Sequence, residues 1–92
     1  MIVYVVCFDI EDDKARREVG NLLGHHGRRV QKSVFEVMFK NNLERIRIED
    51  RARQLLGSCD LLYFYRLCAN CQKNSQNQLG EPLARFPRTV VI

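Results

Sequence analysis

The sequence contains no glycine-rich phosphate loop, no nucleophilic-serine elbow and no dinucleotide-binding fingerprint in its 92 residues. Each of these motifs places backbone amides or a nucleophile against a small substrate. Their absence argues against an enzyme of small-molecule metabolism. A chain of this length also has little room for an internal pocket, and we expect residues 1–92 to form a single domain without a linker.

The chain also lacks a hydrophobic run long enough to span a bilayer. Its apolar run at residues 2–8 has no basic region before it and stops at Asp9, whereas a spanning helix needs about 20 apolar residues. We therefore expect a cytoplasmic protein with no membrane partner. In a cytosolic chain with a real core, the four cysteines argue against a disulfide framework; they are Cys7, Cys59, Cys68 and Cys71.

Basic residues outnumber acidic ones by 15 to 11, for a formal charge of +4. Eleven of the basic residues are arginine, whose planar fork of donors matches phosphate. The surplus suits a polyanionic partner, although a soluble protein with scattered charge would show the same total. We favour phosphate contacts for Arg16, Arg17, Arg28 and Arg29, and a solvated helix face for Arg45, Arg47, Arg51 and Arg53. No aromatic residues interleave with these arginines, so base stacking is weakly supported.

Residues 2–9 are typical of a strand that is buried on both faces and ends on a carboxylate. Alternation places Ile2, Tyr4, Val6 and Phe8 on one face and Val3, Val5, Cys7 and Asp9 on the other. At the end of a central strand, Asp9 is a candidate ligand for a hard divalent ion. The alternative is a turn or cap residue, as acids after strands often are.

The rest of the chain predicts two helices and further strands. Asp12 or Asp13 can cap a helix over about residues 12–26, with Gly27 as its terminator. Residues 28–39 have strand character interrupted at residues 31–33, so one bent strand and two strands both remain possible. A second helix begins at Asn41 or Asn42 and ends near Gly57. Its apolar stripe is Ile48, Ala52, Leu55 and Leu56, which Leu43 and Ile46 do not join.

Strands at residues 61–67 and 89–92 complete the pattern, with a polar stretch between them. The order is that of an α+β, ferredoxin-like βαββαβ sandwich with an extra C-terminal strand. This architecture covers only one face of the sheet with helices, yet residues 2–8 and 61–65 are apolar on both faces. We therefore expect a homodimer packed through the open sheet faces. Two copies of Asp9 could then meet across the two-fold axis.

Two other groups could bind metal. Cys68 and Cys71 have zinc-ligand spacing, but a structural site needs four ligands and the chain has no second such pair. Two protomers, or Cys59 with a histidine, could complete the set; reduced cysteines at a strand end are the alternative. His25 and His26 are adjacent and cannot face one point on a helix, so a solvated helix end is expected for them.

Together these residues form a pattern that resembles the CRISPR-associated Cas2 family, the small second subunit of the CRISPR adaptation machinery. The resemblance covers nearly the whole chain. The segments that carry it are Phe8-Asp9-Ile10, Arg16-Arg17, the run Gly27-Arg28-Arg29-Val30-Gln31-Lys32-Ser33-Val34-Phe35-Glu36, and Tyr63-Phe64-Tyr65-Arg66-Leu67.

The resemblance implies a ferredoxin-like symmetric homodimer that lies between two dimers of the Cas1 integrase while foreign DNA is captured as new spacers. It also implies a magnesium-dependent endonuclease acting on single-stranded RNA or double-stranded DNA. By this likeness Asp9 would be the catalytic residue and the Mg²⁺ ligand, and Arg16, Arg17 and Arg29 would lie near nucleic-acid backbone. Phe8, Ser33 and Phe35 would lie near the dimer cleft, and residues 89–92 would join the partner's sheet.

One departure from the family pattern is visible, because Phe8 stands where the family often has tyrosine and so lacks its hydroxyl. Two function classes follow, a DNA-binding adaptor for integration and a metal-dependent phosphodiesterase. A toxin-type ferredoxin-like RNase acting on messenger RNA is a further alternative.

Overall fold

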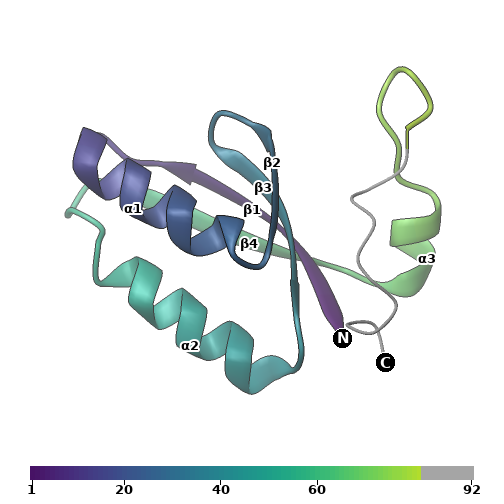
Figure 1. Cartoon of the computed structure of the whole chain (residues 1–92), viewed down its shortest axis with the longest axis horizontal. Coiled ribbons are helices and arrows are strands. Elements are labelled where there is room, and N and C mark those ends of the chain that lie inside the picture. Colours follow the sequence, from purple (N-terminus) through teal and green to yellow (C-terminus); the bar gives the residue numbers. More distant parts are fainter. Residues whose placement is uncertain (82–92) are drawn as a thin grey trace.

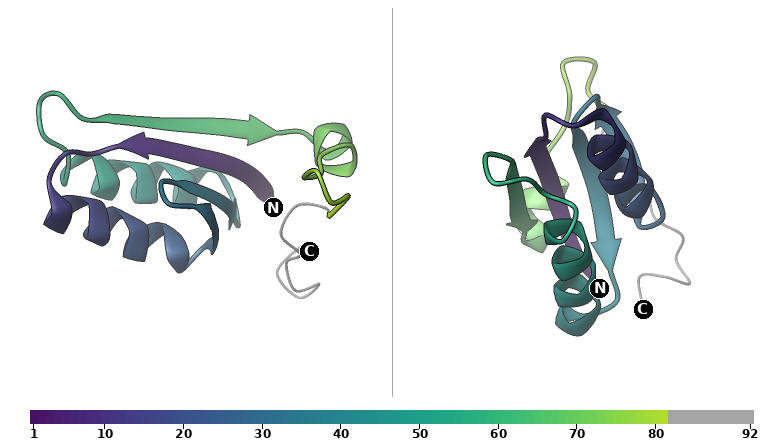
Figure 2. Two further views of the ribbon diagram at one scale, coloured as in Figure 1. Left: turned by 90° about the horizontal axis from the view of Figure 1, so that it is seen from above. Right: turned by 90° about the vertical axis from the view of Figure 1, so that its left-hand side faces the viewer.

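The computed structural model describes residues 1–81. Along the chain the elements are β1 (Ile2–Asp9), α1 (Asp13–Gly24), β2 (Gly27–Gln31), β3 (Val34–Phe39), α2 (Asn42–Arg53), β4 (Leu61–Leu67) and α3 (Ala69–Lys73) (Figure 1). The strands form one antiparallel sheet in the order β2-β3-β1-β4. Helices α1 and α2 lie on the same side of this sheet (Figure 2). The expected ferredoxin-like α+β arrangement is confirmed, while the expected strand at residues 89–92 lies outside the described residues.

The core lies between the two helices and one face of the sheet. Tyr4, Val6 and Phe8 of β1 are buried there, on the face that alternation assigned to them. The other buried members are Ile10, Val19, Leu23, Phe35, Val37 and Phe39. The aromatic rings of the core pack in pairs. Tyr4 contacts Phe39 and Phe64 edge to face, and Phe8 stacks on Phe35.

Both long helices begin at the expected caps. The Asp12 carboxylate accepts a hydrogen bond from the Ala15 N–H at 2.8 Å, and the Asn41 side chain accepts one from the Glu44 N–H at 2.9 Å. Such caps satisfy amides that have no partner within the helix. The predicted stripe of α2 is also confirmed: Ala52 is fully buried, and Ile48, Leu55 and Leu56 pack on the core, whereas Leu43 and Ile46 are exposed.

The expected helix ends were wrong. Helix α1 stops at Gly24 and Gly27 instead begins β2, while α2 stops at Arg53, well before Gly57. Residues 28–39 form two strands joined by a tight turn at residues 32–33, with a register shift between Arg29 and Gln31. The short helix α3 in the polar stretch was not expected. Within residues 1–81, no helix is long and apolar enough to cross a membrane.

The second face of the sheet is covered by neither α1 nor α2 (Figure 2). Strand register places four rows of side chains on it: Asp9 beside Leu61; Gln31, Val34, Cys7 and Tyr63; Arg28, Glu36, Val5 and Tyr65; and Met38, Val3 and Leu67. We call these residues the open face. Leu61, Tyr63 and Tyr65 are 49%, 46% and 54% exposed, and the two tyrosine rings stack with centroids 6.0 Å apart. The open face therefore has an apolar, aromatic side along β4.

Candidate nucleic-acid interface

Asp9 is exposed at the end of β1, on the open face. It pairs with Leu61 at the start of β4, so its carboxylate leaves the sheet beside an exposed apolar side chain. Among residues 1–81, no group of three or more His, Cys, Asp or Glu side chains is arranged to hold a metal ion. One chain therefore offers fewer than three such ligands at this point.

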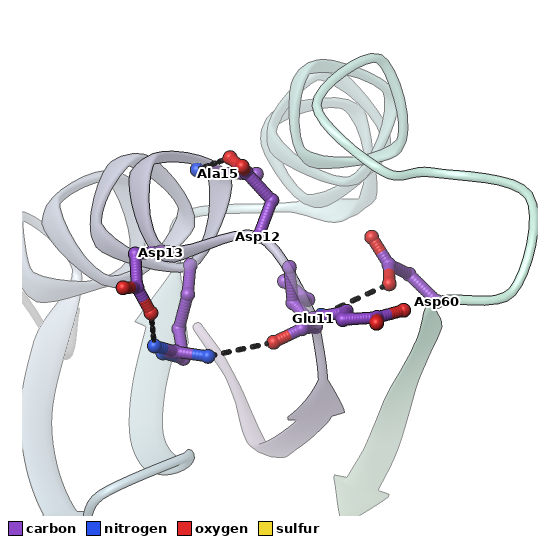
Figure 3. Close-up of polar contacts among 7 residues, drawn as sticks. Glu11, Asp12, Asp13, Ala15 and Asp60 are labelled. Carbon is purple, nitrogen blue, oxygen red and sulfur yellow. Dashed lines mark hydrogen bonds and ion pairs between the residues drawn. The ribbon is translucent and has the colours of Figure 1, made fainter.

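Two side chains hold the segment that follows Asp9. The Asp60 carboxylate accepts a hydrogen bond from the Glu11 N–H at 3.1 Å, which ties the β1–α1 loop to the α2–β4 loop (Figure 3). It also accepts one from the Gly57 N–H at 2.7 Å. The Arg16 guanidinium donates to the Ile10 carbonyl at 2.9 Å and forms an ion pair with Asp13. Arg16 is thus part of the support for the strand end.

A hollow of about 810 Å³ lies between these two loops. Its lining is acidic, with Glu11, Asp12, Asp13 and Asp60 around Ser58 and Cys59. Four carboxylates around one hollow repel the negative charge of a phosphate group. The hollow is therefore a poor place for nucleic-acid backbone, and the basic residues elsewhere are better candidates.

The four arginines assigned to nucleic acid do not gather in one place. Arg28 lies on the open face, 3.5 Å from the Glu36 carboxylate, while the neighbouring Arg29 projects from the helix-covered face. The Arg29 guanidinium stacks on the Phe35 ring, 5.1 Å from its centroid. Arg17 is exposed on α1. Neither Arg17 nor Arg29 forms an ion pair with any residue in the described part of the chain.

Arg47, Arg51 and Arg53 of α2 are exposed, as expected for a solvated helix face. Arg45 is not, because its half-buried guanidinium lies over the Tyr4 ring, 5.9 Å from its centroid. Glu49 accepts from Arg45 at 2.6 Å and from Arg53 at 2.9 Å. Ion pairs four residues apart on a helix contribute little to stability, about 0.3–0.5 kcal/mol each, but they neutralise the charge of both arginines. Of the four arginines assigned to phosphate, Arg17 and Arg29 are the two without an ion pair among residues 1–81.

Phe8 and Phe35 are core residues rather than lining of the open face. They are 6% and 2% exposed and their rings stack 6.0 Å apart beneath the helices, on the side of the sheet away from Asp9. The Ser33 carbonyl accepts from the Phe8 N–H at 3.1 Å, so the β2–β3 turn supports the end of β1. Their expected place near a dimer cleft stays a prediction, and any effect of the two rings on Asp9 passes through the backbone.

The Cys68–Cys71 pair caps the short helix α3. The Cys68 sulfur accepts a hydrogen bond from the Cys71 N–H at 3.4 Å. Hydrogen bonds from Cys71 lower the pKa of the Cys68 thiol, and the side-chain hydrogen bond between the two cysteines raises the pKa of the Cys71 thiol. Cys59 precedes β4 and Cys68 follows it, so the strand, about 3.3 Å per residue, separates them. The proposed completion of a zinc site by Cys59 and a histidine of the same chain was therefore wrong for the described residues.

His26 is not at a solvated helix end. Its side chain packs against the Phe39 ring, 5.4 Å between centroids, with its Nδ1 atom 4.0 Å from the Glu44 carboxylate. Burial lowers the pKa of His26 below its usual 6.5, with Glu44 opposing and His25 assisting the shift. His25 is exposed, as expected.

This environment predicts an acid-sensitive contribution to stability. The pKa of His26 is lower in the folded state than its usual 6.5. As the pH falls through 6.5, the unfolded chain therefore takes up a proton at this residue before the folded chain does. The free energy of unfolding should fall with pH from that point until the folded pKa is passed. His26→Gln should flatten this part of the profile. Urea unfolding between about pH 7.5 and pH 5 measures it.

The matched control for this prediction is His25→Gln at the exposed neighbour. Because His25 is the smallest of the three causes of the shift in the His26 pKa, this change should reduce the slope only slightly. An unchanged slope in the His26→Gln variant would assign the acid sensitivity to other groups.

Two residues of this region gave no signal in the sequence. Asp60 contacts the Glu11 amide across 49 positions, and Gly20 in α1 lies directly beneath the Arg29 guanidinium. Both contacts join distant segments, so no local pattern reports them.

Comparison with known proteins agrees with this arrangement. A family model described as "CRISPR associated protein Cas2" matches residues 1–75. The "CRISPR-associated endoribonuclease Cas2 3" of Synechocystis sp. is 33% identical over 94 residues, covering 100% of both chains. "CRISPR-associated endoribonuclease Cas2 4" of Rhodospirillum rubrum is 38% identical over 68 residues, 74% of this chain. The match spans only 55% of that relative's length.

Solved structures show the same likeness. A chain of a "Partial Cas6-RT-Cas1--Cas2 complex" superposes with a TM-score of 0.78 at 34% identity, covering 94% of this chain and 100% of that one. The crystal structure of Streptococcus pyogenes Cas2 superposes with a TM-score of 0.72 at 30% identity, covering 82% and 96%. Sequence pattern, fold and comparisons agree, and the chain belongs to the CRISPR-associated Cas2 family.

Proposed function

We propose that this chain is an adaptation subunit of a CRISPR system, which binds nucleic acid as a homodimer and bridges Cas1 integrase subunits during spacer acquisition. The observation that carries the proposal is the fold match to a chain of a complex that includes Cas1, over 94% of this chain and all of the neighbour. Such a role would place the protein in the cytoplasm, where the DNA is.

The open face supports the dimer. Three large apolar side chains of β4 are each about half exposed there, next to the half-buried Val5 and Cys7 of β1. A patch of this kind commonly marks an interface, and a two-fold axis lets the patch cover itself. Because the chain matches the Cas2 family, we propose that a second copy of the same chain covers the open face.

The arginines support contact with nucleic-acid backbone. Arg17 and Arg29 are exposed and free of carboxylate partners among residues 1–81, and Arg28 is exposed beside Glu36. Such side chains bind phosphate without reading bases, which suits an adaptor that must accept any captured sequence. Double-stranded DNA is the proposed ligand, and single-stranded RNA is the alternative.

A second candidate function is a magnesium-dependent endonuclease, and Asp9 favours it. The curated relatives carry endoribonuclease names, and Asp9 is an exposed carboxylate at a central strand end. Mg²⁺ is commonly held by one or two carboxylates together with waters and substrate phosphates. Asp9 of one chain would supply one carboxylate, and two copies facing each other in the dimer would supply two. The ion, when bound, would activate water and stabilise charge on phosphate.

Replacing Asp9 with asparagine separates the two functions. The endonuclease hypothesis expects hydrolysis of RNA or DNA by the purified protein in saturating magnesium to fall at least about a hundredfold, because amide oxygen carries no charge for the ion. The adaptor hypothesis expects spacer acquisition in cells, DNA binding and Cas1 binding to persist. Nuclease assays and array sequencing of the same variant measure both.

Asp50→Asn, at an exposed carboxylate of α2, is the matched control and should change neither readout. Cleavage that survives in Asp9→Asn contradicts the nuclease role of Asp9. Loss of acquisition with intact DNA and Cas1 binding contradicts a purely structural role.

The toxin-type RNase alternative is not favoured. The family model covers residues 1–75 and the relatives reported above are all Cas2 proteins. Co-purification with Cas1 supports the adaptor, whereas cleavage of cellular messenger RNA without Cas1 would support the toxin.

A further inference from the structure

Gly20 lies at the middle of α1 with no side chain where the Arg29 guanidinium rests. A Cβ atom added at Gly20 would lie 2.7 Å from the Arg29 Nη2 atom. That distance is well inside van der Waals contact, so any larger residue requires the guanidinium to move. The Phe35 ring, by contrast, would remain 3.7 Å from the new atom, an ordinary contact. The nearest atom to the added Cβ therefore belongs to Arg29, and it is the one that would have to move.

Phe35 fixes the other side of the guanidinium. The Arg29 Cζ atom lies 5.1 Å from the centroid of the Phe35 ring, which is 2% exposed and stacked on Phe8. Since the ring is held by the core, it is a rigid platform for a cation. Arginine otherwise carries about 2 kcal/mol of side-chain rotamer entropy, part of which is lost whenever it binds. A guanidinium held between helix backbone and ring has already lost part of that freedom.

The charge of Arg29 remains available. Arg16 and Arg28 each have a carboxylate partner, whereas Arg29 has none among residues 1–81 and is exposed. Arg17 precedes Gly20 by three positions and so lies on the same side of α1, again exposed. Arg17 and Arg29 are thus two exposed cations near Gly20, and a guanidinium can bind a backbone phosphate through two parallel N–H donors.

We propose that Gly20 is a positioning residue for nucleic-acid binding: its missing side chain holds the Arg29 guanidinium over Phe35, oriented to bind a backbone phosphate. This inference rests on the proposed function and adds to it which arginine is preorganised and by what. Preorganisation raises affinity because less freedom is lost at the moment of binding. Gly20 itself touches no ligand.

The test is Gly20→Ala, measured by binding to a fluorescein-labelled DNA duplex over a salt series. The affinity should fall roughly tenfold, as for loss of one charge-assisted hydrogen bond, and the slope of log affinity against log salt should fall by about one. The matched control is Gly24→Ala in the same helix, where the new atom meets nothing within 4 Å. This control should bind as the parent chain does.

A double-mutant cycle with Arg29→Ala separates positioning from a general effect on the helix. Gly20→Ala should cost nothing further once Arg29 is gone, because the two changes remove one contact. An effect of equal size in both backgrounds would overturn the inference. If Arg29→Ala weakens binding but Gly20→Ala does not, Gly20 has no positioning role and the proposed function stands. If Arg29→Ala binds normally, both the role of Arg29 and the inference fail.

A measurement without DNA keeps the inference testable if a variant binds poorly for other reasons. The Arg29 side-chain NMR signals should be shifted by the Phe35 ring current in the parent chain and in Gly24→Ala. In Gly20→Ala they should move to the position of a solvated arginine. Signals that do not move, in a variant with the parent's urea unfolding midpoint, would overturn the inference.

Discussion

Replacing Gly27 with alanine is expected to destabilise the fold more than any other single methyl addition at its glycines. A Cβ atom at Gly27 would lie 1.8 Å from the Glu36 carbonyl oxygen and 2.6 Å from the Val37 Cα atom. Both are backbone atoms of β3, the strand that Gly27 pairs with, so no side-chain rotation relieves the clash. Overpacking in a core typically costs 1–3 kcal/mol. A clash with paired backbone should cost more, about 3 kcal/mol or above.

Urea unfolding followed by circular dichroism measures this loss against a total of roughly 5–15 kcal/mol for a domain. Gly24→Ala is the control, because nothing lies within 4 Å of the added atom and the change improves helix propensity. An unfolding midpoint of Gly27→Ala equal to that of the parent would show that β2 and β3 can separate at this point without cost.

The role of Gly27 also shows where sequence reasoning stops. Glycine after a helical pattern predicts a terminator, and the caps at Asp12 and Asn41 were read correctly because each acts within three residues. The reason that position 27 is glycine lies ten residues away, in the backbone of β3. Periodicity located the helices and strands since their faces are set by local spacing. It could not locate a contact between strands whose pairing was still undecided.

The candidate site divides in the same way. Asp9 was identified from its place at the end of an apolar run, and the structure confirms that it is exposed on the open face. Arginines next to each other in sequence were treated as pairs, but Arg28 and Arg29 project to opposite faces of β2. Arg16 and Arg17 likewise differ, since only Arg16 binds the Ile10 carbonyl. Two adjacent arginines have the same charge but contact different residues. Those contacts depend on tertiary packing, which the local sequence does not report.

The two sides of the sheet carry different candidate functional residues. The helix-covered side orders Phe8 and Phe35 and, through them, Arg29 at its rim. The open face carries Asp9 at one end and the apolar side chains of β4 along its edge. A dimer through the open face would leave the Arg17 and Arg29 positions outside the interface, free for nucleic acid. The dimer is therefore the assumption on which both proposed functions depend most.

Replacing Tyr63 and Tyr65 together with glutamate is expected to convert the dimer to monomers. Buried aromatic side chains at an interface commonly contribute 2 kcal/mol or more each, so the dissociation constant should rise at least about a thousandfold. In an isologous interface each added charge also appears on the partner, and burying four carboxylates without partners adds to the cost. Sedimentation at micromolar concentration measures the change.

The monomer itself should keep its fold, because both rings are about half exposed in the single chain and neither belongs to the core between sheet and helices. Leu43→Glu is the matched control: Leu43 is 64% exposed on α2, on the other side of the sheet, and its replacement should leave the dimer intact. A double variant that still sediments as a dimer would place the interface elsewhere. It would also remove the symmetric pair of Asp9 carboxylates, because only packing through the open face brings the two copies together.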